Sequence, residues 1–592
     1  MPSNNMSFMQ RPGRRWSSFV IGSNDALGGS RKGDPTSTAI GAYTERATSR
    51  LGDHRRLHQA TTAGLLDTLS GPHFHQFPSE LAGILGQQAV HLTMQDQRDH
   101  TEFDEEREGL LSGKEYYDGQ DGSDQHDVSR KRVYLLAGIL AFLMLSAVFG
   151  PPMLKSPRPR ADFDCHKLRS NGTHTFRKTS LIVSIDGLRA SYLDRGLTPH
   201  LLDISKKGLR AKSMRPIFPT LTFPNHWALM TGLYAESHGI VANNFWDPKS
   251  KSEFHYNKVE SCSNSSWWYG EPMWETAEKA GIITANLMWP GPWETRTGIS
   301  PTYFVPWKDK VPLKEKHDQI MTWIDLPLEK RPQFILAYEP SLDQAGHLTG
   351  PNSPLVNRVL GEVDAFARDL HESLIARNLA DIVDIVFVSD HGMTDTSRPE
   401  HVYMDDILGE GYEMMDHVDG WPSMGIRFSS EANATYYLDL LQNAALQSNG
   451  KFDVYTHETM PQRYHFSHND RIAPIYVVPK VGYVLTDHVE NGAGMSKGNH
   501  GYDNDDESMH AMFVAHGPFS SVVKAVQQSS NGGLMRRFLS RPNKGWHHAS
   551  NDTYILNTFQ NVEIYNLMMK LLGIEHRAAP TNGTEGFWDK YF

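Results

Sequence analysis

The stretch DIVDIVFVSDHG, which covers residues 381–392, decides the fold. Its apolar and β-branched residues continue almost without interruption until the chain reaches Asp390 and His391. A run of this length and composition is typical of a strand that is buried on both faces, as strands of parallel sheets are. The sequence therefore predicts a central strand here, with two polar side chains at its carboxyl end.

Two earlier runs end in a similar way. SLIVSID, residues 180–186, finishes at Asp186, and QFILAYEP, residues 333–340, is followed three residues later by Asp343. In open α/β sheets, ligands bind beyond the carboxyl ends of the strands. Three acidic side chains at one edge would repel each other strongly unless cations bind between them.

A helix is predicted between the second and third runs, over residues 355–376, because its apolar residues keep helical spacing. These residues are Val356, Val359, Leu360, Val363, Phe366, Leu370 and Leu374. A helix between two parallel strands is a crossover connection. Residues 561–574 give one further helical pattern. We expect a large α/β domain with a central, mostly parallel sheet and helices on both faces.

Histidines accompany the acidic residues. His347 lies four residues after Asp343 in a glycine-containing segment that we expect to form a loop, and His500 lies in GNHGYDN. Mixed Asp and His ligation suits zinc or a similar transition ion better than calcium or magnesium. The sequence therefore predicts a transition-metal site at the carboxyl edge of the sheet.

A candidate nucleophile lies in IFPTLTFPNHWALMTGLYAESHGI, residues 217–240, which contains Thr220 and Thr222. An alkyl hydroxyl is almost never ionised at neutral pH, so it needs a neighbouring base or a metal before it can attack. The residues alone leave the choice between the two hydroxyls open.

The first 150 residues differ from the rest in composition and in hydrophobic pattern. Residues 1–132 are polar and lack a sustained apolar period, so we expect a disordered cytoplasmic tail. Residues 133–150 carry no charge, which predicts a transmembrane helix over 133–153. The alternative is a buried helix of a soluble domain. Residues 154–175 would be a stalk, and 176–592 the catalytic domain.

Flanking charges and glycosylation motifs suggest an orientation. Basic residues at 130–132 favour a cytoplasmic N-terminus, which makes the chain a type II membrane protein. Five N-glycosylation motifs follow the predicted helix, at Asn171, Asn264, Asn433, Asn551 and Asn582. We therefore expect the catalytic domain outside the cell or in a vacuolar or secretory lumen.

Charge and cysteine content limit the other possibilities. The 592-residue chain has a net charge of −11, which argues against sequence-specific or other binding of polymeric nucleic acid through a basic face. Cys165 and Cys262 are the two cysteines, and one disulfide between them would fit an oxidising compartment. Nothing in the sequence implies an obligate protein partner.

Taken in order, seven motifs give the chain a family resemblance over about residues 180–505. They are SIDG, PTLTFPNHWALMTGLYAESHGI, GEPMWETA, MWPG, DQAGH, VSDHGM and GNHGYDN. The combination resembles the nucleotide pyrophosphatase/phosphodiesterase family of the alkaline phosphatase superfamily. The resemblance implies an alkaline phosphatase-like domain with two zinc ions and a threonine nucleophile.

The family pattern assigns roles to residues of this chain. The nucleophile is the threonine directly before Phe-Pro-Asn, which is Thr222, and we expect it also to cap a helix that begins near Pro224. Asn243 would hold a phosphoryl oxygen. One zinc ion would be held by Asp343, His347 and His500, and the other by Asp186, Asp390, His391 and the Thr222 oxygen.

Aromatic residues complete the site that the resemblance implies. Phe223 would pack against a nucleobase, and Trp307 occupies the place where the family commonly has a tyrosine on the other face of the base. The chain departs from many animal members at Leu221, where they carry a lysine. The segment 289–312 is long, whereas members that cleave lysophospholipids have it shortened.

These features imply a zinc-dependent hydrolase of phosphodiester and pyrophosphate bonds in nucleoside triphosphates, dinucleotides and nucleotide sugars. It would act through a covalent nucleotidyl-threonine and release nucleoside 5′-monophosphates, with a role in phosphate scavenging. One alternative is a lipid-headgroup phosphodiesterase or phosphomonoesterase with the same metals. Another is a non-catalytic surface protein, although such a protein would be free to lose the ligands that this chain keeps.

Overall fold

The computed structural model describes residues 134–135, 137–140, 163–164, 166–492, 495–531, 546–548 and 554–592. The predicted tail, Cys165 and Asn551 lie outside these residues. Of the predicted membrane span, only 134–135 and 137–140 are described, and they are helical. Within the described residues, no helix combines the length and the apolar character that crossing a membrane requires. The transmembrane helix therefore stays a prediction.

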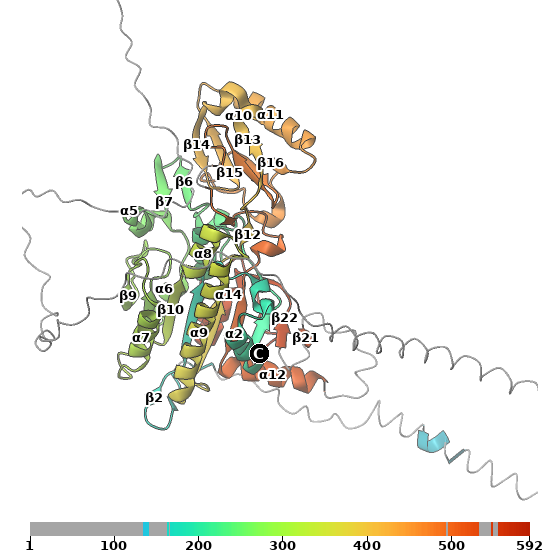
Figure 1. Cartoon of the computed structure of the whole chain (residues 1–592). Helices are drawn as coiled ribbons and strands as arrows, with labels where there is room; N and C mark the ends of the chain where they lie inside the picture. Colours follow the sequence, from blue (N-terminus) through green and yellow to red (C-terminus); the bar gives the residue numbers. More distant parts are fainter. Residues whose placement is uncertain are drawn as a thin grey trace, which may run out of the picture. The chain divides into compact units, whose positions relative to one another are not determined.

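Nine of the described strands form one central sheet (Figure 1). In spatial order they are β21 (Trp546–His548), β22 (Tyr554–Leu556), β4 (Leu209–Ala211), β20 (Phe513–His516), β11 (Val383–Val388), β3 (Thr179–Ile185), β10 (Phe334–Glu339), β8 (Thr284–Leu287) and β9 (Tyr303–Val305). The three predicted strands are its centre, with β3 parallel to both β10 and β11. Their acidic ends therefore meet at one edge, as expected for parallel neighbours.

The sheet is mixed. Strands β9, β8, β10, β3 and β11 run parallel to one another, whereas β20 pairs antiparallel with both β11 and β4. The parallel part is the part that brings the predicted site residues together. The antiparallel strand β20 carries the chain back into the sheet after the segment that contains His500.

Helices cover both faces of the sheet because its strand residues alternate between two apolar cores. On β3, Ile182 packs into one core, whereas Leu181 and Val183 pack into the other. The first core includes residues of α3 (Thr222–Thr231), α6 (Met273–Lys279) and α14 (Glu563–Leu571). The second includes residues of α2 (Pro199–Lys207), α7 (Leu313–Ile324) and α9 (Pro354–Ala376).

The predicted crossover helix is confirmed as α9, which connects β10 to β11 by way of α8 (Ser341–Thr349). All seven residues that carry its apolar period are buried. The Ser353 side chain caps its first turn by accepting a hydrogen bond from the Val356 N–H, and Pro354 occupies a position where its missing N–H costs nothing. The C-terminal helical pattern is confirmed as α14.

A smaller antiparallel sheet lies between β11 and β20 in the sequence and has its own apolar core. Its strands, in spatial order, are β14 (Met415–Asp419), β15 (Met424–Phe428), β17 (Ile475–Pro479) and β16 (Phe452–Thr456). The helix α11 (Ala434–Gln447) contributes Tyr437 and Leu441 to this core. The chain then returns to the main domain through β19 (Gly498–Asn499), directly before His500.

Candidate active site

Six side chains that the sequence singled out converge at the carboxyl edge of the central strands. Asp186 follows β3, Asp390 and His391 follow β11, Asp343 and His347 lie on α8, and His500 follows β19. All six are buried. The structure therefore brings together the three strand ends and a residue more than a hundred positions further along the chain.

Asp343 and His347 lie on one helix and not in the expected loop. They occupy α8, where residues four apart share a face, and His347 Nε2 is 3.4 Å from Asp343 Oδ2. The loop was expected because the segment contains Gly346. In the helix, Gly346 faces Met393, and an added Cβ would come within 2.8 Å of that side chain. Close packing, and not a turn, explains this glycine.

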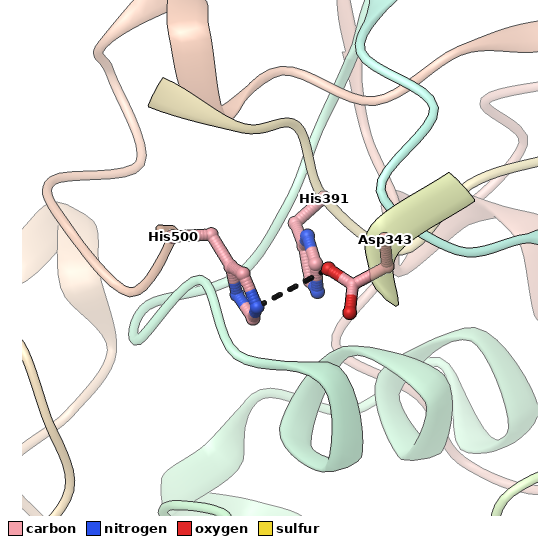
Figure 2. A group of neighbouring side chains, drawn as sticks. All are labelled: Asp343, His391 and His500. Atoms are coloured by element: carbon pink, nitrogen blue, oxygen red, sulfur yellow. Dashed lines mark ion pairs between the residues drawn. The ribbon is translucent and has the colours of Figure 1, made fainter. Parts of the chain in front are cut away.

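One group of potential metal ligands consists of Asp343, His347 and His500, and His391 lies beside it. His500 Nε2 lies 3.5 Å from Asp343 Oδ1, the contact drawn as a dashed line in Figure 2, and 3.1 Å from His347 Nε2. The His391 ring stacks on the His500 ring with their centroids 3.5 Å apart (Figure 2). His391 is therefore close enough to this group to border both of the metal positions that the resemblance implies.

A second group of donors surrounds His391 on its other side. Its Nε2 atom lies 3.3 Å from Asp186 Oδ1 and 3.0 Å from Asp390 Oδ2. The Thr222 hydroxyl joins this group, with Oγ1 3.1 Å from His391 Nε2. The candidate nucleophile and two carboxylates thus share one imidazole nitrogen as their common neighbour.

Main-chain carbonyls orient the three imidazoles. In each ring, Nδ1 lies within hydrogen-bond distance of a carbonyl oxygen: His347 with Gly498 at 2.8 Å, His500 with Thr220 at 2.8 Å, and His391 with Gly392 at 2.9 Å. A carbonyl oxygen only accepts hydrogen bonds, so Nδ1 carries the proton in each neutral ring. The Nε2 lone pairs are left to face the acidic residues, which is how imidazoles bind metals.

The electrostatics of the site call for a cation. Burial, and then repulsion from Asp390 and Asp343, raises the pKa of Asp186 well above its usual range. Burial also raises the pKa of Asp343, and it opposes ionisation of Asp390, whose pKa is nevertheless held well below its usual range by His391 and His226. Burial lowers the pKa of His500 well below its ordinary value.

Three carboxylate oxygens at the site support the same conclusion. Asp186 Oδ1, Asp343 Oδ1 and Asp390 Oδ2 are buried and accept no hydrogen bond in the described part of the chain. Buried polar atoms in native proteins are normally satisfied, and leaving a charged one unpaired is costly. The set of carboxylate oxygens and imidazole Nε2 atoms therefore fits divalent transition ions.

Thr222 is the first residue of α3, so the expectation that its side chain caps a helix beginning near Pro224 is wrong. The cap position is Leu221, and the Thr222 hydroxyl faces His391 instead of the helix N–H groups. Asn243 takes the capping role, because its Oδ1 atom accepts a hydrogen bond of 3.0 Å from the Phe223 N–H. Asn243 is thereby held beside the candidate nucleophile.

The two threonine hydroxyls have different surroundings. The Thr220 hydroxyl donates to the Tyr502 carbonyl at 3.0 Å and accepts from the Gly501 N–H at 2.8 Å. These bonds fasten the segment that carries His500 to the segment before α3. The Thr220 hydroxyl is thus engaged in structure, whereas that of Thr222 points into the donor group.

The two aromatic candidates differ in placement. Phe223 is half-buried, and its ring centroid lies 5.7 Å from that of Tyr256 and 6.2 Å from that of Trp268. Trp307 lies two residues beyond β9, the last strand of the sheet, and its side chain is 55% exposed. The described contacts do not join Trp307 to the residues of the site.

Sequence reasoning missed two residues that contact the donor groups. The Tyr338 hydroxyl donates a 2.5 Å hydrogen bond to Asp186 Oδ2, and His226 Nδ1 lies 3.3 Å from Asp390 Oδ2. Tyr338 falls near the end of a predicted strand, and His226 follows Thr222 by one helical turn. The sequence held a signal for each of them. A polar side chain within a buried strand or helix needs a hydrogen-bonding partner, and here the nearby carboxylates are those partners.

Comparisons with known proteins agree with this site. A family model described as type I phosphodiesterase/nucleotide pyrophosphatase matches residues 180–503. An uncharacterised pyrophosphatase/phosphodiesterase of Schizosaccharomyces pombe is 37% identical over 422 residues, which are 70% of this chain and 80% of that protein. Human ectonucleotide pyrophosphatase/phosphodiesterase family member 1 is 33% identical over 69% of this chain, but only 41% of its own length is covered.

A solved structure resembles the described chain as well. Murine ectonucleotide pyrophosphatase/phosphodiesterase 5 is 30% identical, with a TM-score of 0.59, and the match covers 70% of this chain and 98% of that one. An inactive threonine-to-alanine variant of the same murine protein has been solved with AMP; it is 28% identical, with a TM-score of 0.59, over 70% of this chain and 100% of that one.

Proposed function

This chain belongs to the type I phosphodiesterase/nucleotide pyrophosphatase family, and we propose that it hydrolyses phosphodiester and pyrophosphate bonds of nucleotides to release nucleoside 5′-monophosphates. The observation that carries the proposal is the Thr222 hydroxyl, 3.1 Å from His391 Nε2 at the border of the donor groups. The murine relative supports it, because its threonine-to-alanine variant is inactive and binds AMP.

The proposal includes two zinc ions. Asp343, His347 and His500 would hold one ion, while Asp186, Asp390 and His391 would hold the other together with the Thr222 oxygen. Bound zinc supplies a Lewis acid that lowers the pKa of a hydroxyl and neutralises negative charge on a phosphoryl group. The carboxylate oxygens that accept no hydrogen bond from described residues, and the Nε2 lone pairs that face them, support this assignment.

Thr222 acts as the nucleophile in this proposal. The Thr222 hydroxyl gives up its proton to solvent, and its Oγ atom attacks phosphorus in line with the leaving group. The new P–O bond forms, and the leaving group departs with the electrons of the bond that breaks. The product of this step is a nucleotidyl-threonine diester. Water then hydrolyses that diester and returns the threonine hydroxyl, which releases the nucleoside 5′-monophosphate. A helix N-terminus is a favourable place for this anionic group.

Asn243 orients the phosphoryl group in this proposal. Its carbonyl oxygen accepts the Phe223 N–H, so its NH₂ group is the part that is left to donate a hydrogen bond to a phosphoryl oxygen. The hydrogen bond to Phe223 fixes the amide relative to Thr222. Asn243 thereby donates to the same group that Thr222 attacks, and this supports preorganised stabilisation of the charge that develops.

The substrates proposed are nucleoside triphosphates, dinucleotides and nucleotide sugars. The half-buried Phe223 ring, next to Thr222, would stack on the base, and Trp307 would cover its other face. Stacking on an aromatic ring tolerates every base, so we expect broad nucleotide acceptance. Trp307 is 55% exposed in this structure, so its ring is accessible to a base from solvent.

We also propose a type II membrane topology, with the catalytic domain outside the cell or in a vacuolar or secretory lumen, and a role in phosphate scavenging. The exposed asparagines Asn264, Asn433 and Asn582 suit glycosylation. Asn171 suits it less, because its amide nitrogen, the atom that a glycan would be attached to, donates to the Arg377 carbonyl at 2.8 Å.

A comparison of substrates tests the proposed function. The purified full-length protein should hydrolyse a nitrophenyl ester of a nucleoside 5′-monophosphate at least about a hundredfold faster than nitrophenyl phosphate. It should also cleave a dinucleoside polyphosphate and leave lysophosphatidylcholine intact. Faster cleavage of lysophosphatidylcholine or of nitrophenyl phosphate would instead assign the site to lipids or to phosphomonoesters.

A further inference from the structure

We infer that His226 is a positioning residue, which ties the helix that carries the nucleophile to β3 and to the carboxylate of Asp390. The inference rests on the proposed function, because it assigns His226 to the same metal-binding site. It goes beyond the ligand set given above, in which His226 has no part.

His226 lies one turn into α3 and is fully buried. Its Nδ1 atom is 2.9 Å from the Thr222 carbonyl oxygen and 3.3 Å from Asp390 Oδ2. Its Nε2 atom is 2.9 Å from Ser184 Oγ. One imidazole therefore contacts the backbone of the nucleophile, a carboxylate that follows β11 and a side chain of β3.

The geometry distinguishes between two roles for this ring. Asp186, His226 and Asp390 each offer one atom within 4.8 Å of the others, so His226 could be taken for a metal ligand. However, the Thr222 carbonyl only accepts hydrogen bonds, so Nδ1 carries the proton. The other nitrogen, Nε2, then accepts from the Ser184 hydroxyl. The nitrogen that faces Asp390 has no lone pair for an ion, which assigns His226 to positioning.

The ring is also fixed in orientation. It packs edge-on against Trp289, with centroids 5.4 Å apart, and against Tyr338, with centroids 4.9 Å apart. Ser184 lies on β3, one residue before the end of the strand, and Asp186 directly follows that end. The contact with Ser184 therefore sets His226 relative to the strand that delivers Asp186.

This arrangement has a functional consequence. The Nδ1–H group lies near Asp390 Oδ2, an oxygen that accepts no hydrogen bond from described residues, and favours its negative charge. The same group holds the first turn of α3, from which the Thr222 hydroxyl projects. Loss of the Nδ1–H group should therefore weaken metal binding and misplace the nucleophile together. Partners of metal ligands typically contribute about 10- to 100-fold to metal affinity or activity.

Two amide variants separate the contacts of the two ring nitrogens. In His226→Asn the amide nitrogen can take the place of Nδ1, and in His226→Gln it can take the place of Nε2. The metal-free full-length protein is titrated with zinc against a competing chromophoric chelator, and kcat and KM are measured separately. We expect zinc affinity and kcat to fall at least about tenfold in His226→Gln and about threefold in His226→Asn, with KM nearly unchanged.

Several outcomes would overturn the inference. Wild-type zinc affinity and kcat in His226→Gln would show that the ring only fills space. Loss of one whole equivalent of bound zinc in both variants would show that His226 is a ligand. If His226→Gln does not fold, as judged by circular dichroism of the metal-free protein, Ser184→Ala decides: a fall of about threefold or more in zinc affinity supports positioning, and wild-type affinity overturns it.

Failure of the proposed function is distinguishable from failure of this inference. Zinc binding by the wild-type protein without cleavage of nucleotide esters would reject the proposed function, yet the ranking of the two variants in zinc affinity would still test His226.

Discussion

Tyr338 donates a 2.5 Å hydrogen bond to Asp186 Oδ2, and Asp186 Oδ1, the other oxygen of that carboxylate, lies 3.3 Å from His391 Nε2. One oxygen is thus fixed by a phenol, while the other faces the potential metal ligands and accepts no hydrogen bond from described residues. The two oxygens of Asp186 therefore have different roles: Oδ2 fixes the orientation of the carboxylate, and Oδ1 can bind a metal ion.

Tyr338→Phe should lower zinc affinity about tenfold, because Asp186 Oδ2 loses its buried hydrogen bond and the carboxylate can rotate. Zinc titration of the metal-free protein measures the effect. Tyr303→Phe is the matched control, since Tyr303 lies on the last strand, β9, and its hydroxyl donates to the exposed Lys330 carbonyl. Equal affinities in the two variants would mean that Tyr338 does not orient Asp186.

The two threonines should respond differently to substitution. Thr222→Ala should reduce kcat by at least about a thousandfold, because the nucleophile is lost. It should change the free energy of unfolding by less than about 1 kcal/mol, because the Thr222 hydroxyl makes no hydrogen bond to the backbone of the described residues. Thr220→Ala should cost about 1–3 kcal/mol of stability, since the buried Gly501 N–H loses its acceptor. Steady-state kinetics and urea unfolding measure both effects. The reverse pattern would identify Thr220 as the nucleophile.

Metal removal should lower both activity and stability. Without cations, Asp186, Asp343 and Asp390 are buried close together, and their mutual repulsion opposes folding. We expect chelation to abolish turnover and lower the Tm, and added zinc to restore both, with a Tm that rises with zinc concentration. Thermal unfolding monitored at several zinc concentrations gives the result. A Tm independent of zinc would argue against a metal at this site.

Acid should destabilise the fold through a histidine pair remote from the donor groups. His371 Nε2 on α9 lies 3.2 Å from His516 Nδ1 on β20. Burial, together with His371 and the lysines Lys524 and Lys207, lowers the pKa of His516 from 6.5 to about 4. The unfolded chain therefore takes up a proton below pH 6.5 that the folded chain refuses until about pH 4.

The stability that His516 contributes is thus fully present above pH 6.5 and is lost as the pH falls towards 4. Urea unfolding of the metal-free protein between these values should show a smaller dependence on pH in His516→Asn than in the wild type. His317→Asn is a suitable control, because that imidazole is near the surface and pairs with the hydroxyl of Ser373. An unchanged pH dependence in His516→Asn would show that His516 is protonated normally.

Much of the centre of the fold was predictable because its signals are physical and local. Long apolar runs such as that of residues 383–388 suit few environments other than a strand buried on both faces, and α9 shows a helical period over its whole length. The acidic residues at the strand ends then followed from the common direction of parallel neighbours. The convergence of His500 with them was expected from family resemblance and not from periodicity.

Other features were hidden because their cause is tertiary. Gly346 looks like a loop residue but is small because Met393 packs against it, so α8 was missed. His226 and Tyr338 lie in apolar elements, and their importance appears only when Asp390 and Asp186 are placed beside them. The small sheet around β15 consists of short strands, and the connections on either side of β16 are long. Alternation is weak in such segments.

The carbonyl anchors of the three imidazoles have a consequence for how this site can change over time. Every amino acid supplies a carbonyl, so the anchors at Gly498 and Gly392 do not depend on side-chain chemistry. Both positions are nevertheless closed to larger residues, since an added Cβ would approach the Gly346 oxygen to 2.5 Å and the Ser508 oxygen to 2.1 Å. Reorienting these imidazoles would therefore require a shift of the polypeptide backbone, because exchanging neighbouring side chains leaves their carbonyl anchors in place.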